Sequence, residues 1–189
     1  MRNSLIAVIA ALGCGAAAFG AETYSIDRSH TFPRFEISHF GFSTHHGQFN
    51  ATSGRIVLDR AARTGSIEIK VDTASISTGD PALERVLRSD KFFNVQKFPA
   101  MIFRSNALKF EGDTPAAAAG ELTLLDVTRP LTLTISRSKC AEHPITRKDA
   151  CGAEVTGTLR RSDFGMTAYV PAVGDEVTLH IQVEAINYY

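Results

Sequence analysis

The stretch from residue 120 to residue 137 constrains the fold more than any other part of the chain. It reads GELTLLDVTRPLTLTISR, and apolar and polar side chains alternate in it on both sides of a break at residues 125–130. Alternation with a period of two places one face of a strand against apolar material and the other in water. Pro130 cannot donate to a ladder, so it fits the start of a strand. The stretch therefore predicts two neighbouring antiparallel strands with a short connection.

The same alternation recurs along the chain, most clearly at residues 66–72 (SIEIKVD) and 175–187. Asp80, a capping residue followed by Pro81, predicts the start of one short helix. We expect separate strands at residues 101–105 and 108–110, and a loop in the small residues 114–119. At least eight short strands with one helix indicate an all-β fold, either an antiparallel barrel or a sandwich around one apolar interior.

The length of the chain fits a single domain, and its first twenty residues indicate export. The chain has 189 residues and a formal net charge of zero, so no excess of positive charge steers it towards nucleic acid. Residues 1–20 combine Arg2, an apolar run and small residues, which predicts a signal peptide and a mature domain over residues 21–189. The expected location is the periplasm or the exterior. A lipoprotein anchored through Cys14 is the alternative.

Export to an oxidising compartment would explain the other two cysteines of the chain. Cys140 and Cys151 enclose the loop-like sequence AEHPITRKDA, and in an oxidising compartment we expect them to pair. Two free thiols are the alternative. A redox pair is disfavoured because such pairs usually have CxxC spacing.

A series of short motifs resembles the YceI-like family, in order and from about residue 21 to residue 185. They are SH at 29–30, SHFGFST at 38–44, GQF at 47–49, GRI at 54–56, LRSDKFF at 87–93, KFP at 97–99, IFRS at 102–105, GELTL at 120–124, VTRP at 127–130 and RSDFGM at 161–166. Two positions depart from the family pattern. Asp126 stands where members often have Gly, and Pro33 puts the regularity of the first long strand in doubt.

The resemblance implies a lipocalin-like antiparallel β-barrel of about eight strands. It also implies an exported protein that binds, stores or transports a polyisoprenoid-chain lipid, such as a polyprenyl quinone precursor, and that is associated with stress. No catalytic reaction or cofactor belongs to that expectation. The implied partner is an isoprenoid lipid or quinone-like amphiphile, with transient contact with a membrane or membrane proteins. The oligomeric state is left open, a homodimer being one arrangement.

Alternation selects the residues expected to bind such a lipid. The expected cavity lining is Phe35, Ile37, Phe49, Ile67, Ile69, Val71, Met101, Phe103, Leu122, Leu124, Leu133, Ile135, Leu179 and Ile181. The expected cavity entrance is His39, Phe40, Phe42, Leu83, Leu87, Phe92, Phe93 and Phe164.

Three other functions remain as alternatives. His39, His45 and His46, with His30, suggest a metal- or haem-binding stress protein, although adjacent residues of a strand face opposite ways. Ser29, His30 and Asp163 could form a hydrolase site, but no G-x-S-x-G motif is present. A ligand-free structural β-module would have a tightly filled interior.

We expect Arg161 and Asp163 to form an ion pair at a strand end.

Overall fold

The computed structural model describes residues 20–188. The expected signal peptide lies outside these residues apart from Gly20, and so does Cys14. The strands are β1 Glu22–Ile26, β2 Phe32–His39, β3 Ser43–Phe49, β4 Thr52–Asp59, β5 Thr64–Asp72, β6 Ile76–Ser77, β7 Ala100–Glu111, β8 Thr114–Leu124, β9 Val127–Glu142, β10 Asp149–Arg160 and β11 Val173–Ile186. One α-helix, α1, covers Pro81–Arg88, and the 3-10 helices η1 and η2 cover Thr73–Ser75 and Arg161–Phe164.

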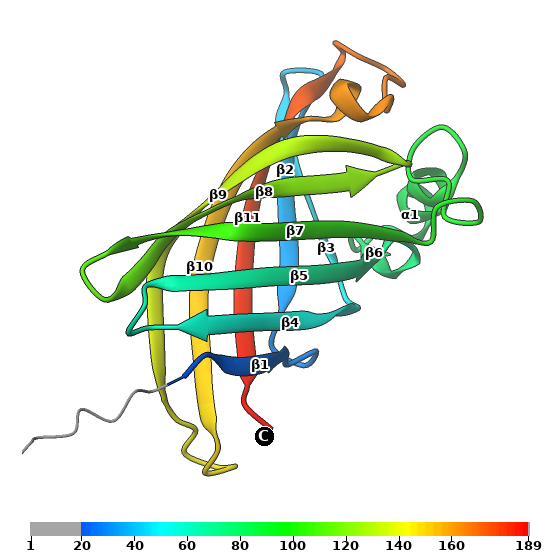
Figure 1. Cartoon of the computed structure of the whole chain (residues 1–189). Helices are drawn as coiled ribbons and strands as arrows, with labels where there is room; N and C mark the ends of the chain where they lie inside the picture. Colours follow the sequence, from blue (N-terminus) through cyan, green and yellow to red (C-terminus); the bar gives the residue numbers. More distant parts are fainter. Residues whose placement is uncertain (1–19, 189) are drawn as a thin grey trace, which may run out of the picture.

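All the strands belong to one antiparallel sheet, which closes into a barrel (Figure 1). Eight strands form the closed part in the order β1-β4-β5-β7-β8-β9-β10-β11, and β1 completes it by pairing with β11 at Ser25↔Ile186. The hairpin β2–β3 continues the wall along the rest of β11 and joins β6 at Phe49↔Ile76. The prediction of an antiparallel barrel of about eight strands is confirmed.

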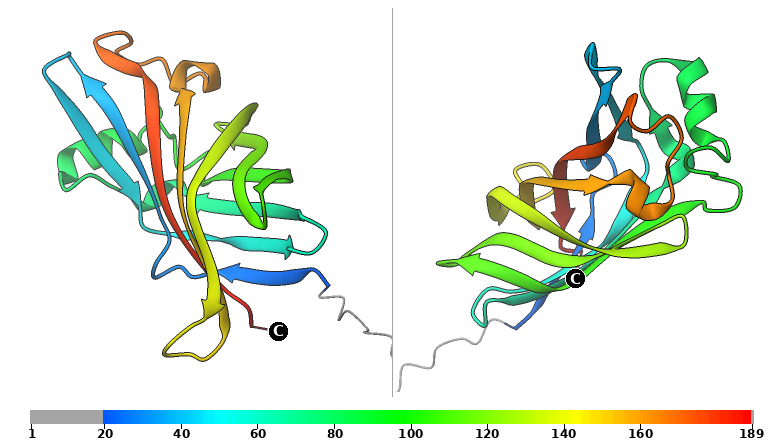
Figure 2. Two further views of the ribbon diagram at one scale, coloured as in Figure 1. Left: turned by 90° about the vertical axis from the view of Figure 1, so that its left-hand side faces the viewer. Right: turned by 90° about the horizontal axis from the view of Figure 1, so that it is seen from above.

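The two ends of the barrel differ. Near β1, a cluster of buried residues that includes Tyr24, Ile26 and Leu58 fills the interior. At the other end, η2 and the β2–β3 turn stand above the sheet, with α1 beside them (Figure 2). We call these the closed end and the mouth. Within residues 20–188, no helix has the length and apolarity needed to cross a membrane.

The β8–β9 hairpin confirms the two strands expected from the alternation, but the expected break at residues 125–130 is shorter and Pro130 lies inside β9, paired with Glu121. Leu124 faces Val127, so the connection has only two residues, Leu125 and Asp126. Both have positive φ, of 52° and 64°, which is the backbone of the two-residue turns that suit the twist of a hairpin. Asp126, at a position where family members often have Gly, adopts this left-handed conformation.

Three local expectations were wrong. Residues 114–119 are part of β8, because these small residues pair with β7 on one side and β9 on the other. Residues 100–111 form one strand, β7, whose register shifts between Arg104 and Ala107. The strands β9 and β10 extend past the cysteines by two residues on each side, to Glu142 and Asp149, so that Cys140 and Cys151 face each other across the ladder.

Asp80 and Pro81 at the start of α1, and Pro33 near the start of β2, occupy positions that suit their chemistry. The Asp80 side chain accepts a hydrogen bond from the Ala82 amide and caps α1, with Pro81 at its first position. Pro33 is the second residue of β2 and precedes the β2–β3 ladder, which begins at Arg34↔Gln48. The pairing of β2 with β3 is therefore regular from Arg34 to His39. On the other side, Pro33 faces Ile181 of β11, and that ladder shifts its register between Val173 and Val177.

Candidate functional site

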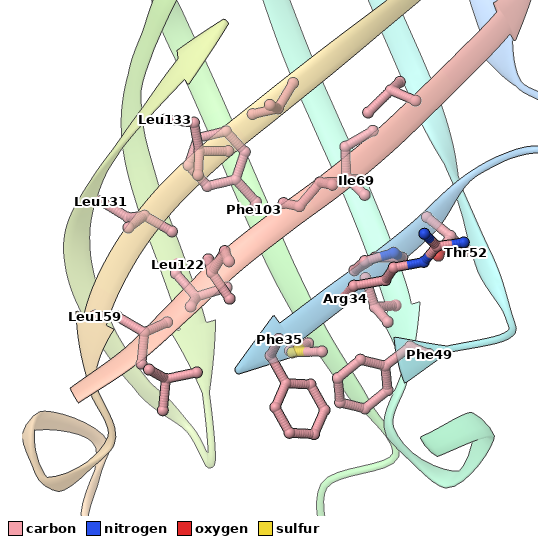
Figure 3. A pocket seen from close by; sticks show the side chains of 18 of the residues that line it. Arg34, Phe35, Phe49, Thr52, Ile69, Phe103, Leu122, Leu131, Leu133 and Leu159 are labelled. Carbon is pink, nitrogen blue, oxygen red and sulfur yellow. The ribbon is translucent and has the colours of Figure 1, made fainter. Parts of the chain in front are cut away.

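The barrel encloses an apolar cavity of about 470 Å³, within the range of roughly 300–1,000 Å³ usual for small-molecule sites. Its wall is almost entirely carbon. Side chains from strands all around the barrel line it, among them Phe35 of β2, Phe103 of β7 and Leu133 of β9 (Figure 3). The interior is therefore hollow, which contradicts the tightly filled core expected of a ligand-free structural module.

Every residue expected to line the cavity lies in its wall. They are Phe35, Ile37, Phe49, Ile67, Ile69, Val71, Met101, Phe103, Leu122, Leu124, Leu133, Ile135, Leu179 and Ile181. They come from β2, β3, β5, β7, β8, β9 and β11, and alternation put each on the inner face. Whether they contact a ligand is still a prediction.

Two glycines allow phenylalanine rings to lie flat against the wall. A Cβ on Gly47 would be 2.4 Å from the ring of Phe35, which faces it across the β2–β3 pair. A Cβ on Gly120 would be 2.8 Å from the ring of Phe103. Because these glycines carry no side chain, the rings occupy the space beside the strand and leave the centre of the barrel open.

The mouth contains most of the residues predicted there. His39, Phe40, Leu83, Leu87, Phe92 and Phe93 all line the cavity. The Phe92 ring lies 6.2 Å from the ring of Tyr169, so an aromatic pair links the segment after α1 to the segment after η2. Phe93 packs edge-on against Phe49 at 5.4 Å. Aromatic side chains thus surround the opening.

Two of the residues expected at the entrance do not line the cavity. Phe42 is 92% exposed at the β2–β3 turn and does not line the cavity. Phe164 is buried in a cluster with Leu131 and Met166 and does not line the cavity either. Neither position follows a strand period, because Phe42 lies in a turn and Phe164 in η2, so alternation could not orient their side chains.

Some lining residues were missed by the sequence reasoning. They include Ile26, Ile56, Leu58, Leu108, Leu131, Val155, Leu159, Val177, Val183 and, at the mouth, Tyr169 and Val173. Most alternate in phase with their strands and could have been found by extending the period along β9, β10 and β11. Tyr169 lies in an irregular segment and gives no such signal.

A few polar groups also line the cavity. Thr52 is 1% exposed, and its hydroxyl has no hydrogen-bond partner within the part of the chain that the structure describes. Arg34, from β2, is another polar residue of the lining (Figure 3). Arg34 also lines a polar groove on the outside of the barrel, which shares His46 and Thr78 with the cavity. Polar atoms are therefore available in an otherwise apolar wall.

Arg161 is buried at the mouth. The ion pair expected between Arg161 and Asp163 is not formed. The Arg161 guanidinium donates hydrogen bonds to the carbonyl oxygens of Gly174 (2.8 Å), Met166 (2.8 Å) and Val173 (3.0 Å). Burial lowers the pKa of this group, and the nearby Asp175 carboxylate opposes the shift. The strand-end ion pair is formed by the neighbouring Arg160, whose Nε lies 2.9 Å from Asp175 Oδ2. Arg161 instead ties η2 to the start of β11.

Of the four histidines of the metal hypothesis, the structure brings His39 and His45 together and places the other two apart from this pair. His39 and His45 line the mouth and stack with ring centroids 4.0 Å apart. His46 reaches Glu36, with 3.5 Å between Nδ1 and Oε1. His30 lies in the β1–β2 connection, towards the closed end (Figure 1).

Within residues 20–188, one other group brings three possible metal ligands together. Ligand atoms of Asp27, His30 and Glu184 lie within 4.8 Å of one another. Burial disfavours the Asp27 carboxylate, but hydrogen bonds from His30 (2.8 Å) and the Ser29 amide outweigh it and lower its pKa. The hydrogen bond to Asp27 raises the pKa of His30. An ordinary ion pair accounts for this arrangement, and none of the three residues lines the cavity.

The hydrolase alternative is wrong in its geometry. His30 bonds to Asp27 in the connection between β1 and β2. Asp163 belongs to η2, which Figure 1 shows at the opposite end of the barrel. Ser29 and His30 therefore cannot act together with Asp163.

The predicted disulfide is confirmed. Cys140 and Cys151 are bonded, with Cα atoms 4.1 Å apart, and the bond joins β9 to β10. Both residues also line the cavity, close to the cluster that fills the closed end. The bond thus links β9 to β10 at the closed end of the barrel.

Comparison with known proteins identifies the family. The family model for the YceI-like domain matches residues 24–185. The chain belongs to the YceI-like family. Curated YceI proteins agree: one from Salmonella arizonae and one from Salmonella paratyphi B are each 34% identical over 170 residues, covering 88% of both chains. The resemblance found in the sequence motifs is confirmed.

Solved structures extend the comparison to the fold of YceI-like proteins. The YCEI protein of Campylobacter jejuni superposes with a TM-score of 0.68 and 26% identity, covering 81% of this chain and 91% of that one. A polyisoprenoid binding domain from Saccharophagus degradans gives a TM-score of 0.63 at 14% identity, covering 87% and 98%. At that identity the second likeness concerns the fold alone.

Proposed function

We propose that this protein binds a polyisoprenoid-chain lipid in the barrel and holds it for storage or transport. The observation that carries the proposal is the cavity itself, a carbon-walled hollow of about 470 Å³ that is plugged at one end and open at the other. Burying a methylene group contributes about 0.8 kcal/mol, so a long hydrocarbon tail gains ample free energy before ordering costs are subtracted. A related fold in Saccharophagus degradans is a polyisoprenoid binding domain, which supports this ligand class.

The wall favours one orientation of the lipid. Ile26 and Leu58 surround the deep end, whereas the stacked rings of His39 and His45 provide hydrogen-bonding nitrogens at the mouth. We expect the tail to point towards the closed end and the headgroup to remain at the mouth. This arrangement requires no charged group to leave water.

The compartment is part of the proposal. The apolar run at residues 1–20 is typical of a signal peptide, and a disulfide between Cys140 and Cys151 suits an oxidising compartment. Together they support a periplasmic or secreted lipid carrier.

Extraction of the freshly purified protein with organic solvent tests the ligand class. Mass spectrometry of the extract is expected to show a long isoprenoid chain at close to one molecule per barrel. The same protein, unfolded and refolded without lipid, provides the control and should take up an added polyprenyl lipid. An extract without lipid, together with no uptake by the refolded protein, would contradict the proposal. So would an extract that holds only straight-chain lipids.

A further inference from the structure

Large apolar side chains are exposed at the mouth of the barrel. Of the exposed large apolar residues in the described part of the chain, Phe40, Phe42, Val86, Tyr169 and Val170 lie there, and only Ile145 and Tyr188 lie towards the closed end. Phe42 is 92% exposed, Tyr169 55% and Phe40 52%. Single exposed apolar residues are common, but a group of them marks a surface that meets another apolar phase.

Two turns carry most of this group and lie side by side. The Phe40 amide at the β2–β3 turn donates a hydrogen bond of 2.8 Å to the carbonyl oxygen of Ala172, in the segment between η2 and β11. Figure 2 also shows these two segments next to each other. We call residues 40–44 and 167–172 the tips.

The tips carry no formal charge. Residues 40–44 read FGFST and residues 167–172 read TAYVPA, in a chain of which 21% is charged. Their backbone is partly satisfied internally, since the Phe42 amide bonds to the His39 carbonyl and the Val170 amide to the Thr167 carbonyl. The tips could therefore enter an apolar phase without desolvating a charge.

The tips also adjoin the cavity. Phe40 and Tyr169 line its wall as well as being exposed, so apolar surface continues from the interior to the outside of the molecule. A lipid tail could pass along this surface without crossing water. This part of the argument rests on the proposed lipid-binding function.

We propose that the tips are a membrane-docking surface that inserts Phe42, Phe40, Tyr169 and Val170 into the interfacial region of a phospholipid bilayer. Aromatic side chains are suited to that region. A second copy of the chain fits less well, because stable protein interfaces use about 20–30 residues a side and the tips are two narrow turns. The docked barrel has its mouth against the bilayer.

The absence of Trp from the sequence provides a clean reporter. Phe42→Trp places the only indole of the protein at the tips. Ile145→Trp places it at another strongly exposed site, 84% exposed in the β9–β10 connection at the far end of the barrel. On addition of phosphatidylcholine vesicles, the emission of Phe42→Trp should shift to shorter wavelength and that of Ile145→Trp should not. No shift for Phe42→Trp, or an equal shift for both, would overturn the proposal.

A second pair of variants tests the contribution of the apolar side chains. Phe42→Ser with Val170→Ser should weaken partitioning onto the vesicles by about tenfold or more, because two apolar groups no longer enter the bilayer. Neither residue lines the cavity, so the melting temperature and the extracted lipid should be unchanged. If the double variant partitions like the original protein, or loses self-association instead of vesicle binding, the docking proposal is wrong.

Salt and vesicle composition separate this mode of docking from a charged one. Since the tips are uncharged, binding should be similar on phosphatidylcholine vesicles and on vesicles that also contain phosphatidylglycerol, and it should persist in concentrated NaCl. Binding that requires the anionic lipid and disappears in salt would contradict insertion of the tips. The lipid content of the same preparations is measured separately, so a barrel that carries lipid without docking rejects only this inference.

Discussion

At the scale of single residues, the hydroxyl of Thr52 is an exception in the cavity wall. It has no hydrogen-bond partner among the described residues, and the wall around it is made almost entirely of carbon. Thr52 is 1% exposed. A buried polar atom left unpaired usually costs about 1–3 kcal/mol. Such a cost is tolerated where the atom serves a ligand, and Thr52 lies in the cavity wall.

Thr52→Val tests whether this hydroxyl is a cost to the folded state. Valine has nearly the same shape and removes only the polar atom, so the free energy of unfolding of the lipid-free protein should rise by about 1 kcal/mol. Urea denaturation measures it, and Thr31→Val is the contrasting variant. The Thr31 hydroxyl bonds to both the amide and the carbonyl of Glu184, so its loss should destabilise the protein. Equal effects of the two variants would contradict this account of Thr52.

At the scale of strands, Gly47 and Gly120 each leave room for a phenylalanine ring beside the cavity wall. The atoms that surround the two glycines differ. At Gly47, the atoms nearest to an added Cβ all belong to the Phe35 ring, which can turn. At Gly120, the nearest atom is the backbone carbonyl oxygen of Arg104, at 2.2 Å, which cannot move without disturbing β7. The same substitution should therefore act on the cavity at one site and on the sheet at the other.

Gly47→Ala and Gly120→Ala make that contrast measurable. Gly47→Ala should push the Phe35 ring towards the cavity and reduce the length of the lipid that it accepts, at a cost of about 1 kcal/mol in stability. Gly120→Ala should lower the free energy of unfolding by about 2–4 kcal/mol. Denaturation and mass spectrometry of extracted lipid distinguish the two. A stable Gly120→Ala protein would show that the strands can separate at this point.

The disulfide acts on the β9–β10 hairpin. It closes a short loop, with a sequence separation of 11, and the chain-entropy model gives about 3 kcal/mol for a loop of similar size. Cys140→Ala with Cys151→Ala should lower the melting temperature by roughly 5–10 °C while the lipid is retained. A reductant should have the same effect on the original protein and none on the double variant. Release of lipid at an unchanged melting temperature would contradict this role.

At the scale of the whole molecule, the barrel is a hollow whose depth should set the length of its ligand. Leu133 is buried in β9 and lines the cavity, whereas the neighbouring Thr132 is exposed on the outer face. The two residues provide a matched pair of positions on the same strand.

Leu133→Trp should shorten the lipid that is bound, since the larger side chain occupies part of the cavity. Thr132→Trp should leave the lipid unchanged, because its side chain points to solvent. Both variants should remain folded, and mass spectrometry of the extracted lipids compares their chain lengths. If the two variants carry the same lipid, Leu133 does not contact the chain and the proposed orientation of the tail must be revised.

Much of the molecule follows from the period of two. Alternation oriented Ile67, Leu122, Leu133 and Leu179 correctly, because a strand has only two faces and burial chooses between them. Asp80 and Pro81 predicted the helix start from local capping chemistry alone. The small residues 114–119 were misread as a loop, because their strand is held by its neighbours β7 and β9 and not by local preference.

The sequence by itself determined which side chains face inward, where the helix begins and which motifs mark the family, since these depend on local geometry and residue order. Only the tertiary structure decided that the centre is hollow, because a cavity depends on the distance between opposite walls and on rings lying against Gly47 and Gly120. It also decided the position of Phe42, Phe164 and Arg161. Their side chains lie outside regular strands, so contacts between distant segments fix their place and no period predicts it.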